Sequence, residues 1–208
     1  MSQYSIGIDL GTTHCVLSYL DLQMADEAAK GDAIKQEVLL IPQLTAPGSI
    51  DERLQLPSFI YQFHESEVAS GDLALPWNGA PSQLVGELAR TMGSKTPIRL
   101  ISSAKSWLCH GGVDRRSAFL PLESPEEVEK ISPFEASVAY LQHLKSSWNH
   151  ANSDNTIENQ QVTITIPASF DPAARELTAE AARAVGFHNL TLLEEPQAAV
   201  YSWIHQAG

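Results

Sequence analysis

The 208-residue sequence is poor in cysteine and in positive charge. Its two cysteines, Cys15 and Cys109, lack the spacing of a disulfide framework, so we expect a reduced, cytoplasmic protein. Lys and Arg number 13 against 25 Asp and Glu, which gives a formal net charge of −12. This balance argues against nucleic acid and anionic membrane as partners, because both require a basic surface. A single nucleotide stays compatible, since it needs only a local pocket.

Several motifs of common enzyme classes are also missing. No apolar run is long enough to cross a bilayer, and the N-terminus lacks the basic region of a signal peptide. GxGxxG, GxSxG and HExxH elements are absent, and the seven histidines lack zinc-site spacing. The segment Gly93-Ser94-Lys95-Thr96 resembles the tail of a Walker A loop, but the required glycines are missing. We therefore interpret it as the end of a helix.

The apolar pattern that is present predicts a mixed α/β fold. Alternation predicts strands at 4–10 and 14–21 joined by a tight turn, with a third strand at 34–42 completing an antiparallel meander. Near the other end, strands at 161–167 and 189–196 flank a helix at 172–185. This strand-helix-strand unit predicts a parallel pair. Other predicted elements are a strand at 57–63 and helices at 81–94, 103–112, 133–150 and 197–206.

The middle of the chain differs in composition from both ends. Residues 43–130 are rich in Pro, Gly and Ser and contain only short predicted elements. We therefore expect a small α+β subdomain inserted into a core made of residues 1–42 and 131–208.

The segment IGIDLGTTHC, at 6–15, places a carboxylate and a Gly-Thr-Thr turn within a strand-like run. Gly11 permits close approach of a ligand, and Thr12 and Thr13 offer neutral donors for phosphate oxygens. Asp9 can hold a hydrated Mg²⁺. An ordinary hairpin with a solvated aspartate explains the same residues.

Two further charged residues are candidates for chemistry. Glu195 lies at the carboxyl end of a predicted strand, where ligands of α/β sheets bind, although a capping or solvated acid would look the same. Lys105 lies between small residues and a tryptophan, and a fixed ammonium can orient water or neutralise charge in phosphoryl transfer. A plain surface lysine is the alternative.

Read in order, these segments resemble the Hsp70 (DnaK-like) family of the actin/sugar kinase/Hsp70 superfamily. The hairpin IGIDLGTTHC resembles the superfamily's first phosphate-binding hairpin. LPSFIYQF and SAKSWL resemble the family's P-S-x-I strand and its lysine segment. Residues 162–203, from VTITIPASF to EEPQAAVYSW, resemble the I-T-V-P-A-x-F strand and E-P-x-A-A segment. The resemblance implies a ribonuclease H-like (actin-like ATPase) fold.

The resemblance also implies roles for residues of the hairpin. Gly11, Thr12 and Thr13 would bind the β- and γ-phosphates together with His14, and Asp9 would hold Mg²⁺ through water. The implied cofactors are ATP or ADP with Mg²⁺, and K⁺ is a further candidate cation.

Four residues outside the hairpin receive roles in the same way. Lys105 would orient the attacking water, and Glu195 would join the metal and water network, with a role as proton acceptor. Pro167 and Arg175 match the pair implicated in signalling between nucleotide and substrate domains. The implied partners of the intact protein are unfolded peptide clients and co-chaperones.

The sequence also departs from the family pattern. His14, Ser169, Glu194 and Gln197 replace its usual residues, which indicates a divergent member. The second phosphate loop, D-x-G-G-G-T, does not occur in the 208 residues, so we expect the N-terminal lobe of a two-lobed ATPase, inactive as a fragment. A sugar or small-metabolite kinase of the same superfamily and an actin-type filament protein are the alternatives.

Overall fold

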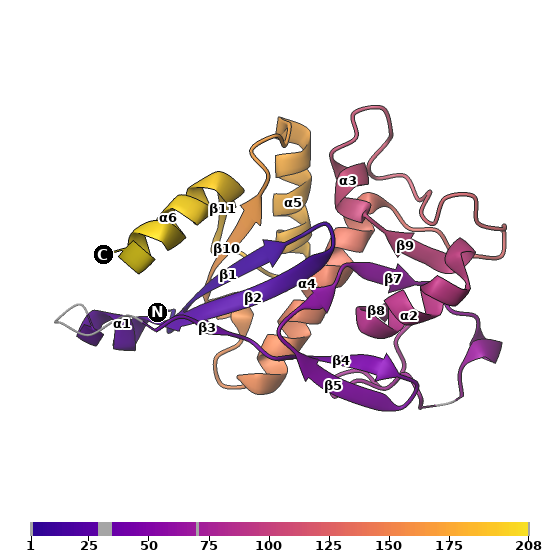
Figure 1. Cartoon of the computed structure of the whole chain (residues 1–208), viewed down its shortest axis with the longest axis horizontal. Helices are drawn as coiled ribbons and strands as arrows, with labels where there is room; N and C mark the ends of the chain where they lie inside the picture. The colour runs from indigo at the N-terminus through magenta and orange to yellow at the C-terminus, as the bar shows by residue number, and fades with distance from the viewer. Residues whose placement is uncertain (1, 29–34, 70, 208) are drawn as a thin grey trace.

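A six-stranded mixed sheet forms the centre of the computed structural model, which describes residues 2–28, 35–69 and 71–207 (Figure 1). The strand order is β11-β10-β1-β2-β3, and β6 also pairs with β2. Strands β1 and β2 are antiparallel, whereas β1, β10 and β11 are parallel, so the predicted mixed sheet is confirmed. The strands are β1 (Tyr4–Leu10), β2 (His14–Asp21), β3 (Glu37–Val38), β6 (Leu56–Pro57), β10 (Gln161–Ile166) and β11 (Leu190–Glu194).

Alternation along the strands decides which face of the sheet is buried. Ile6 and Ile8 of β1 and Ile164 of β10 are at most 1% exposed and face the core. Gly7 and Asp9 alternate with these isoleucines along β1 and lie on the other face, because successive side chains of a strand point to opposite sides. The polar atoms of the predicted hairpin therefore remain accessible while its apolar residues anchor it.

Helices α4 (Pro133–Ala151) and α5 (Pro172–Ala184) cover the buried face. Both begin at the predicted residues, and a side chain caps each: the Ser132 hydroxyl accepts from Glu135 N at 3.0 Å, and the Asp171 carboxylate accepts from Ala174 N at 2.7 Å. Trp148 of α4 is fully buried below the sheet. Burial of each large apolar side chain contributes about 1.5–3 kcal/mol, so this layer holds the sheet in place.

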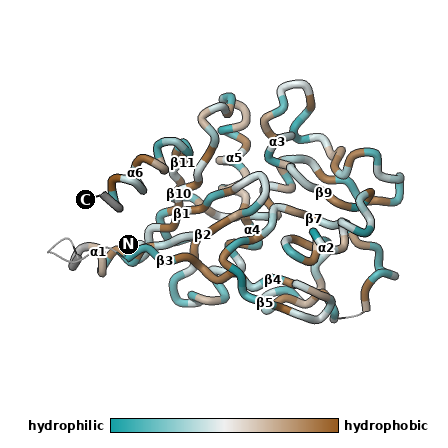
Figure 2. The backbone as a smooth tube through the Cα atoms, in the orientation of Figure 1, coloured by the Kyte–Doolittle hydropathy of each residue, from teal (hydrophilic) through white to brown (hydrophobic). Residues whose placement is uncertain are grey.

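Helix α6 (Glu195–Ala207) lies over the opposite face of the sheet (Figure 1). Its Tyr201 lines a cavity of about 370 Å³ together with Gly7 and Thr163 of the sheet. Several residues of α6 are hydrophobic (Figure 2), and the side chains of Val200, Trp203 and Ile204 are exposed, Trp203 to 68%. The sequence predicted this helix but not its exposed apolar side.

The predicted third strand of the meander is only partly correct. Residue 34 lies outside the described residues, and only Glu37–Val38 pairs with β2. The rest of the β2 edge is occupied by Leu56–Pro57, which pairs with His14 and Cys15. The chain therefore leaves the sheet, and β4 (Ile41–Ala46) forms a separate hairpin with β5 (Ser49–Arg53).

The predicted strand at 57–63 and the predicted helix at 81–94 both need correction. Ser58 divides the strand into β6 and β7 (Phe59–Tyr61), which belong to different sheets. Helix α2 (Glu87–Lys95) begins six residues later than predicted, because β8 (Leu84–Val85) pairs with β7. Gly86 separates β8 from the helix with a φ of +93°, which glycine tolerates best.

The remaining described elements are short. They are α1 (Leu22–Ala28), β9 (Leu100–Ser102), α3 (Ala104–Leu108) and three 3₁₀ turns, at Glu65–Glu67, Pro97–Arg99 and Ile157–Asn159. Helix α3 confirms the predicted helix at 103–112 only over its first half. Within the described parts of the chain, no helix is both long and apolar enough to cross a membrane. The proposed division at residues 42 and 131 stays a prediction.

Candidate functional site

Ser58 fixes both ends of the Gly-Thr-Thr turn between β1 and β2. Its hydroxyl donates to the Gly11 carbonyl at 2.8 Å, and its backbone N–H donates to the Thr13 carbonyl at 2.9 Å. The side chain is 2% exposed. A Cβ at Gly11 would lie 2.2 Å from the His14 carbonyl oxygen, so only glycine fits this close turn. Thr12 is exposed at its tip.

The first candidate metal ligand lies beside this turn. Asp9 is exposed, and its carboxylate accepts a hydrogen bond from the Thr165 hydroxyl at 3.1 Å. Thr165 is the register partner of Asp9 on the parallel strand β10. Thr165 is an uncharged donor, so its hydrogen bond orients the Asp9 carboxylate without neutralising it. A negatively charged carboxylate is what a hydrated divalent cation requires.

Lys105 and Glu195 are brought together although 90 residues separate them. The Lys105 Nζ atom lies 2.9 Å from the Glu195 Oε1 atom. The Lys105 side chain is only 10% exposed, and its ammonium lies 5.7 Å from the Phe170 ring centre. Glu195 is 45% exposed and is the first residue of α6, because β11 ends at Glu194, two residues before the predicted end of the strand. The two residues form one partly buried ion pair.

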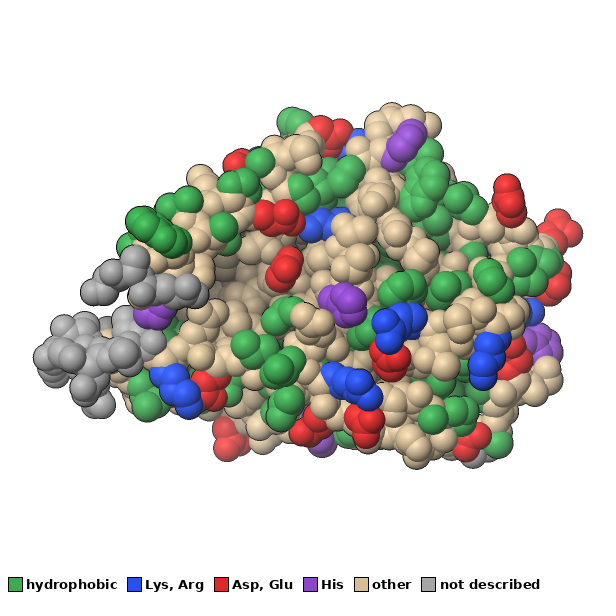
Figure 3. Space-filling view, in the orientation of Figure 1, with side chains coloured by type: hydrophobic (Ala, Val, Ile, Leu, Met, Phe, Trp, Pro, Cys, Tyr) green, Lys and Arg blue, Asp and Glu red, His purple; other side chains and the backbone are tan. Residues whose placement is uncertain are grey.

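The ion pair and the turn share a neighbour in Cys15. Burial raises the pKa of the Cys15 thiol to about 12, and the charges of Asp9 and Lys105 act on it in opposite directions. Cys15 also contacts the Ser58 hydroxyl at 3.3 Å. In the view of Figure 1 the tip between β1 and β2 is drawn next to α3. A hollow between α6 and the sheet (Figure 3) is lined by Asp9 but by neither the turn residues nor Lys105. Their common neighbour Cys15 nevertheless indicates that the predicted phosphate, metal and lysine positions lie around one region.

The His14 side chain forms no hydrogen bond or ion pair with the other candidate residues in the described part of the chain. It is half-buried at the start of β2, and its backbone pairs with Pro57. Its observed contribution is the carbonyl oxygen that restricts position 11 to glycine.

Pro167 and Arg175 are not joined by a direct hydrogen bond among the described residues. Pro167 is half-buried, and its carbonyl accepts from Phe170 N at 3.1 Å. Arg175 instead pairs with Glu194, whose Oε1 atom accepts from both guanidinium Nη atoms at 3.0 and 3.1 Å. Gln197 Oε1 accepts from Glu194 N at 3.4 Å. Two of the residues that depart from the family pattern therefore contact each other, and one of them holds Arg175.

Sequence reasoning missed Arg115, which lies close to the site. Its guanidinium donates to both Asp171 oxygens, at 2.8 and 2.6 Å, and is 9% exposed. This fork, together with the capped N–H of Ala174, holds the pKa of the Asp171 carboxyl well below its usual range. An arginine in a loop gives no periodic signal, and its partner lies 56 residues away.

The residues present fit a nucleotide held through magnesium. The His14 carbonyl restricts position 11 to glycine, and the tight turn that results is of the kind whose backbone N–H groups can bind phosphate oxygens. The part of the chain that the structure describes holds no group of three or more His, Cys, Asp or Glu residues able to bind a metal. One carboxylate at Asp9 agrees with the chemistry of Mg²⁺, which keeps several waters.

The structure is that of an α/β protein with a Gly-Thr-Thr hairpin and a lysine–glutamate pair. Comparison with known proteins gives its family. The Hsp70 protein family model matches residues 53–203. Because this covers most of the chain, the protein belongs to the Hsp70 family, as the sequence resemblance predicts.

Curated relatives include chaperone proteins of bacteria. The chain is 28% identical to chaperone protein HscA of Enterobacter sp. (strain 638) and 32% identical to an HscA homolog of Haemophilus influenzae (strain 86-028NP). It is 30% identical to an HscA homolog of Acinetobacter baylyi. Each match covers 96% of this chain but only 27–28% of the relative. The chain thus spans little more than a quarter of the length of these relatives.

Proposed function

We propose that this chain is the N-terminal nucleotide-binding lobe of an Hsp70-type chaperone, in which ATP hydrolysis drives binding and release of unfolded peptides. The observation that carries this proposal is the Lys105–Glu195 pair, 2.9 Å apart, whose lysine acts on the Cys15 thiol together with Asp9 and the Gly11 backbone. Family membership and the HscA relatives support it. The proposal includes a ribonuclease H-like core formed by residues 1–42 and 131–208, with 43–130 inserted.

In this proposal the turn and Asp9 hold the nucleotide and its metal. Backbone and hydroxyl donors of Gly11, Thr12 and Thr13 bind the phosphate oxygens, and Asp9 holds Mg²⁺ through water. Bound Mg²⁺ supplies charge neutralisation at the phosphates. Catalysis of phosphoryl transfer depends mainly on positioning and charge, which rigid residues on strands and turns provide.

Lys105 and Glu195 act on the attacking water. The ammonium of Lys105 is held by Glu195 and by the surrounding apolar side chains, so it can orient a water molecule without a large loss of entropy. Glu195 is half exposed and negatively charged, which suits a residue of the water network that accepts a proton. We also propose, from the cysteine content, a reduced cytoplasmic location.

The test is phosphate release by the full-length parent protein and by the 208-residue chain. Lys105→Ala should lower kcat of the parent about 100-fold or more. Lys145→Ala is the matched control, because Lys145 also forms an ion pair, at 2.7 Å with Glu158, away from the turn. The short chain should bind ATP weakly and show negligible turnover.

Two results would overturn the proposal. The parent could hydrolyse ATP equally well with Lys105→Ala, or the short chain alone could show robust multiple turnover that Lys105→Ala abolishes. Transfer of phosphate to a sugar by the parent, with no hydrolysis, would instead support a metabolite kinase.

A further inference from the structure

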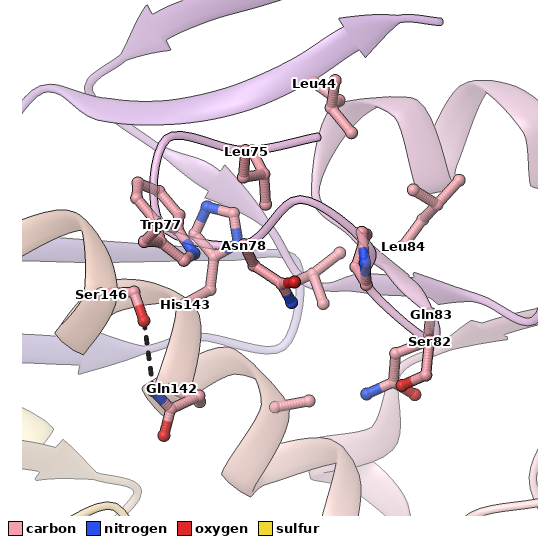
Figure 4. A pocket seen from close by; sticks show the side chains of 13 residues that line it. Leu44, Leu75, Trp77, Asn78, Ser82, Gln83, Leu84, Gln142, His143 and Ser146 are labelled. Carbon is pink, nitrogen blue, oxygen red and sulfur yellow. Dashed lines mark hydrogen bonds between the residues drawn. The ribbon is translucent and has the colours of Figure 1, made fainter. Parts of the chain in front are cut away.

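A second cavity lies on the far side of α4 from the hairpin, between that helix and the segment 75–85. We name it the Trp77 pocket; its volume is about 360 Å³, within the range of small-molecule sites (Figure 4). Its lining includes Leu44, Trp77, Asn78, Gln83, Leu84 and His143. None of the candidate nucleotide residues lines it.

His143 supplies an unpaired acceptor at this pocket. The side chain is 6% exposed, and its Nε2 atom lies 2.9 Å from the Pro42 carbonyl oxygen, so Nε2 carries the hydrogen and donates. Burial lowers the pKa of His143 to about 4, which keeps the ring neutral and makes Nδ1 an acceptor. Nδ1 has no hydrogen-bond partner among the described residues. Among the described side chains, Tyr140 Oη is the one fully buried polar atom without a hydrogen-bond partner. The unpaired Nδ1 atom of His143 is therefore accessible from the pocket side.

Trp77 stands beside this acceptor. The two rings are in edge contact, with centroids 5.3 Å apart and an interplanar angle of 88°. In Figure 4 the His143 ring lies between the Trp77 ring and the Asn78 side chain. The His150 ring is a second neighbour, with its centroid 6.1 Å from that of Trp77. Trp77 is half-buried, so part of the indole is still available to a ligand ring.

The rest of the lining is apolar or neutral. Leu44 and Leu84 are buried and supply an apolar wall, while Asn78 and Gln83 supply amide groups. No Lys, Arg, Asp or Glu lines the pocket. An ionised ligand would lose hydration here without a counter-charge, so the lining selects against ATP, phosphate and metal ions.

We propose that the Trp77 pocket binds a small, neutral aromatic molecule with one N–H or O–H donor, whose ring contacts Trp77 and whose donor bonds His143 Nδ1. The lining comes from α4 on one side and from residues 44 and 75–85 on the other. A bound molecule therefore links these two segments. This site is independent of the proposed nucleotide function.

Indole and benzofuran are the matched probes, because they share size and shape but only indole has an N–H donor. Each probe is titrated into the ¹⁵N-labelled 208-residue chain. NMR chemical shifts of the backbone amides and of the tryptophan and histidine ring nitrogens report binding. Indole should bind with a Kd on the order of 1 mM, as expected for so small a ligand. Benzofuran should bind about tenfold more weakly, because it leaves Nδ1 unpaired.

Variants separate the pocket from nonspecific binding. Trp77→Ala should weaken indole binding about tenfold or more. Trp107→Ala is the control, because Trp107 is also half-buried among aromatic side chains, next to Phe119. His143→Phe should remove the difference between indole and benzofuran. If His143→Phe does not fold, the difference in affinity between indole and benzofuran on the wild-type chain still tests the role of His143 Nδ1.

Saturable indole shifts at Trp77, the His143 Nδ1 resonance and α4, with weaker benzofuran binding, support the proposal. Equal binding of both probes overturns the role of His143. Absence of saturable shifts, or shifts confined to the cavity under α6, overturns the site itself.

Discussion

The Lys105 ammonium lies 2.9 Å from the Glu195 carboxylate, and the two partners differ greatly in exposure, at 10% and 45%. The lysine is thus held in a partly apolar environment, next to the Phe170 ring, while the glutamate reaches solvent. An unequal pair of this kind responds differently to the loss of each partner, because a buried charge without its counter-charge costs more than an exposed one.

Neutral replacement of each partner should therefore give unequal losses of stability. Glu195→Gln should lower the free energy of unfolding by about 1–2 kcal/mol, a value reduced by the solvent exposure of the glutamate. Lys105→Met keeps the packing and leaves only a solvated carboxylate, so its change should stay within about 0.5 kcal/mol. Urea unfolding of the 208-residue chain measures both. A larger loss for Lys105→Met than for Glu195→Gln would contradict this account.

Removal of the Ser58 hydroxyl should loosen the Gly-Thr-Thr turn. Ser58→Ala leaves the Gly11 carbonyl without its donor in a buried setting, and we expect a loss of about 1–3 kcal/mol in urea unfolding. In the full-length parent, nucleotide should bind about tenfold more weakly, because the turn is less preorganised.

Ser147→Ala is the control for Ser58→Ala. The Ser147 hydroxyl is equally buried and donates to the His143 carbonyl at 2.9 Å, but that carbonyl lies within a helix and keeps its backbone partner. We expect a smaller loss of stability and unchanged nucleotide affinity. Equal nucleotide affinity of the two variants would show that Ser58 does not position the turn.

Glu194 should restrain Arg175, which the resemblance places in communication with a substrate domain. Glu194→Asn breaks the ion pair and releases the guanidinium. A partly exposed pair contributes up to about 1 kcal/mol, so peptide stimulation of ATP hydrolysis by the parent should rise by up to about fivefold.

Glu176→Gln provides the comparison for Glu194→Asn. Glu176 forms an exposed ion pair with Arg183 on α5, the helix that also carries Arg175. This variant should leave peptide stimulation unchanged. If both variants change stimulation alike, the effect comes from charge alone and not from Arg175.

His143 should make stability depend on acid. Its pKa falls from 6.5 to about 4 in the folded chain, so the unfolded state binds the proton more readily. The free energy of unfolding is therefore highest above pH 6.5. It decreases by about 3 kcal/mol in all as the pH falls toward 4, because the unfolded state gains the proton first. Urea unfolding of wild type and His143→Phe across this range measures the difference. Parallel curves would contradict the buried neutral ring.

Local patterns in the sequence were sufficient for the elements with strong periodicity. The strand at Gln161–Ile166 and helices α4 and α5 match their predictions closely, because caps such as Asp171 and alternating apolar residues act over a few positions. The predicted strand at 57–63 failed for a tertiary reason. Ser58 leaves one sheet and bonds to the turn 45 or more residues earlier.

The sequence by itself determined the mixed sheet, the Gly-Thr-Thr hairpin and the family resemblance, because these depend on residue type and near-neighbour spacing. Only the tertiary structure decided that Lys105 meets Glu195, that Arg115 holds Asp171 and that Glu194 holds Arg175. Charged side chains carry no periodic signal for a distant partner. Their pairing depends on how strands and helices are stacked, and that is set by the apolar core beneath them.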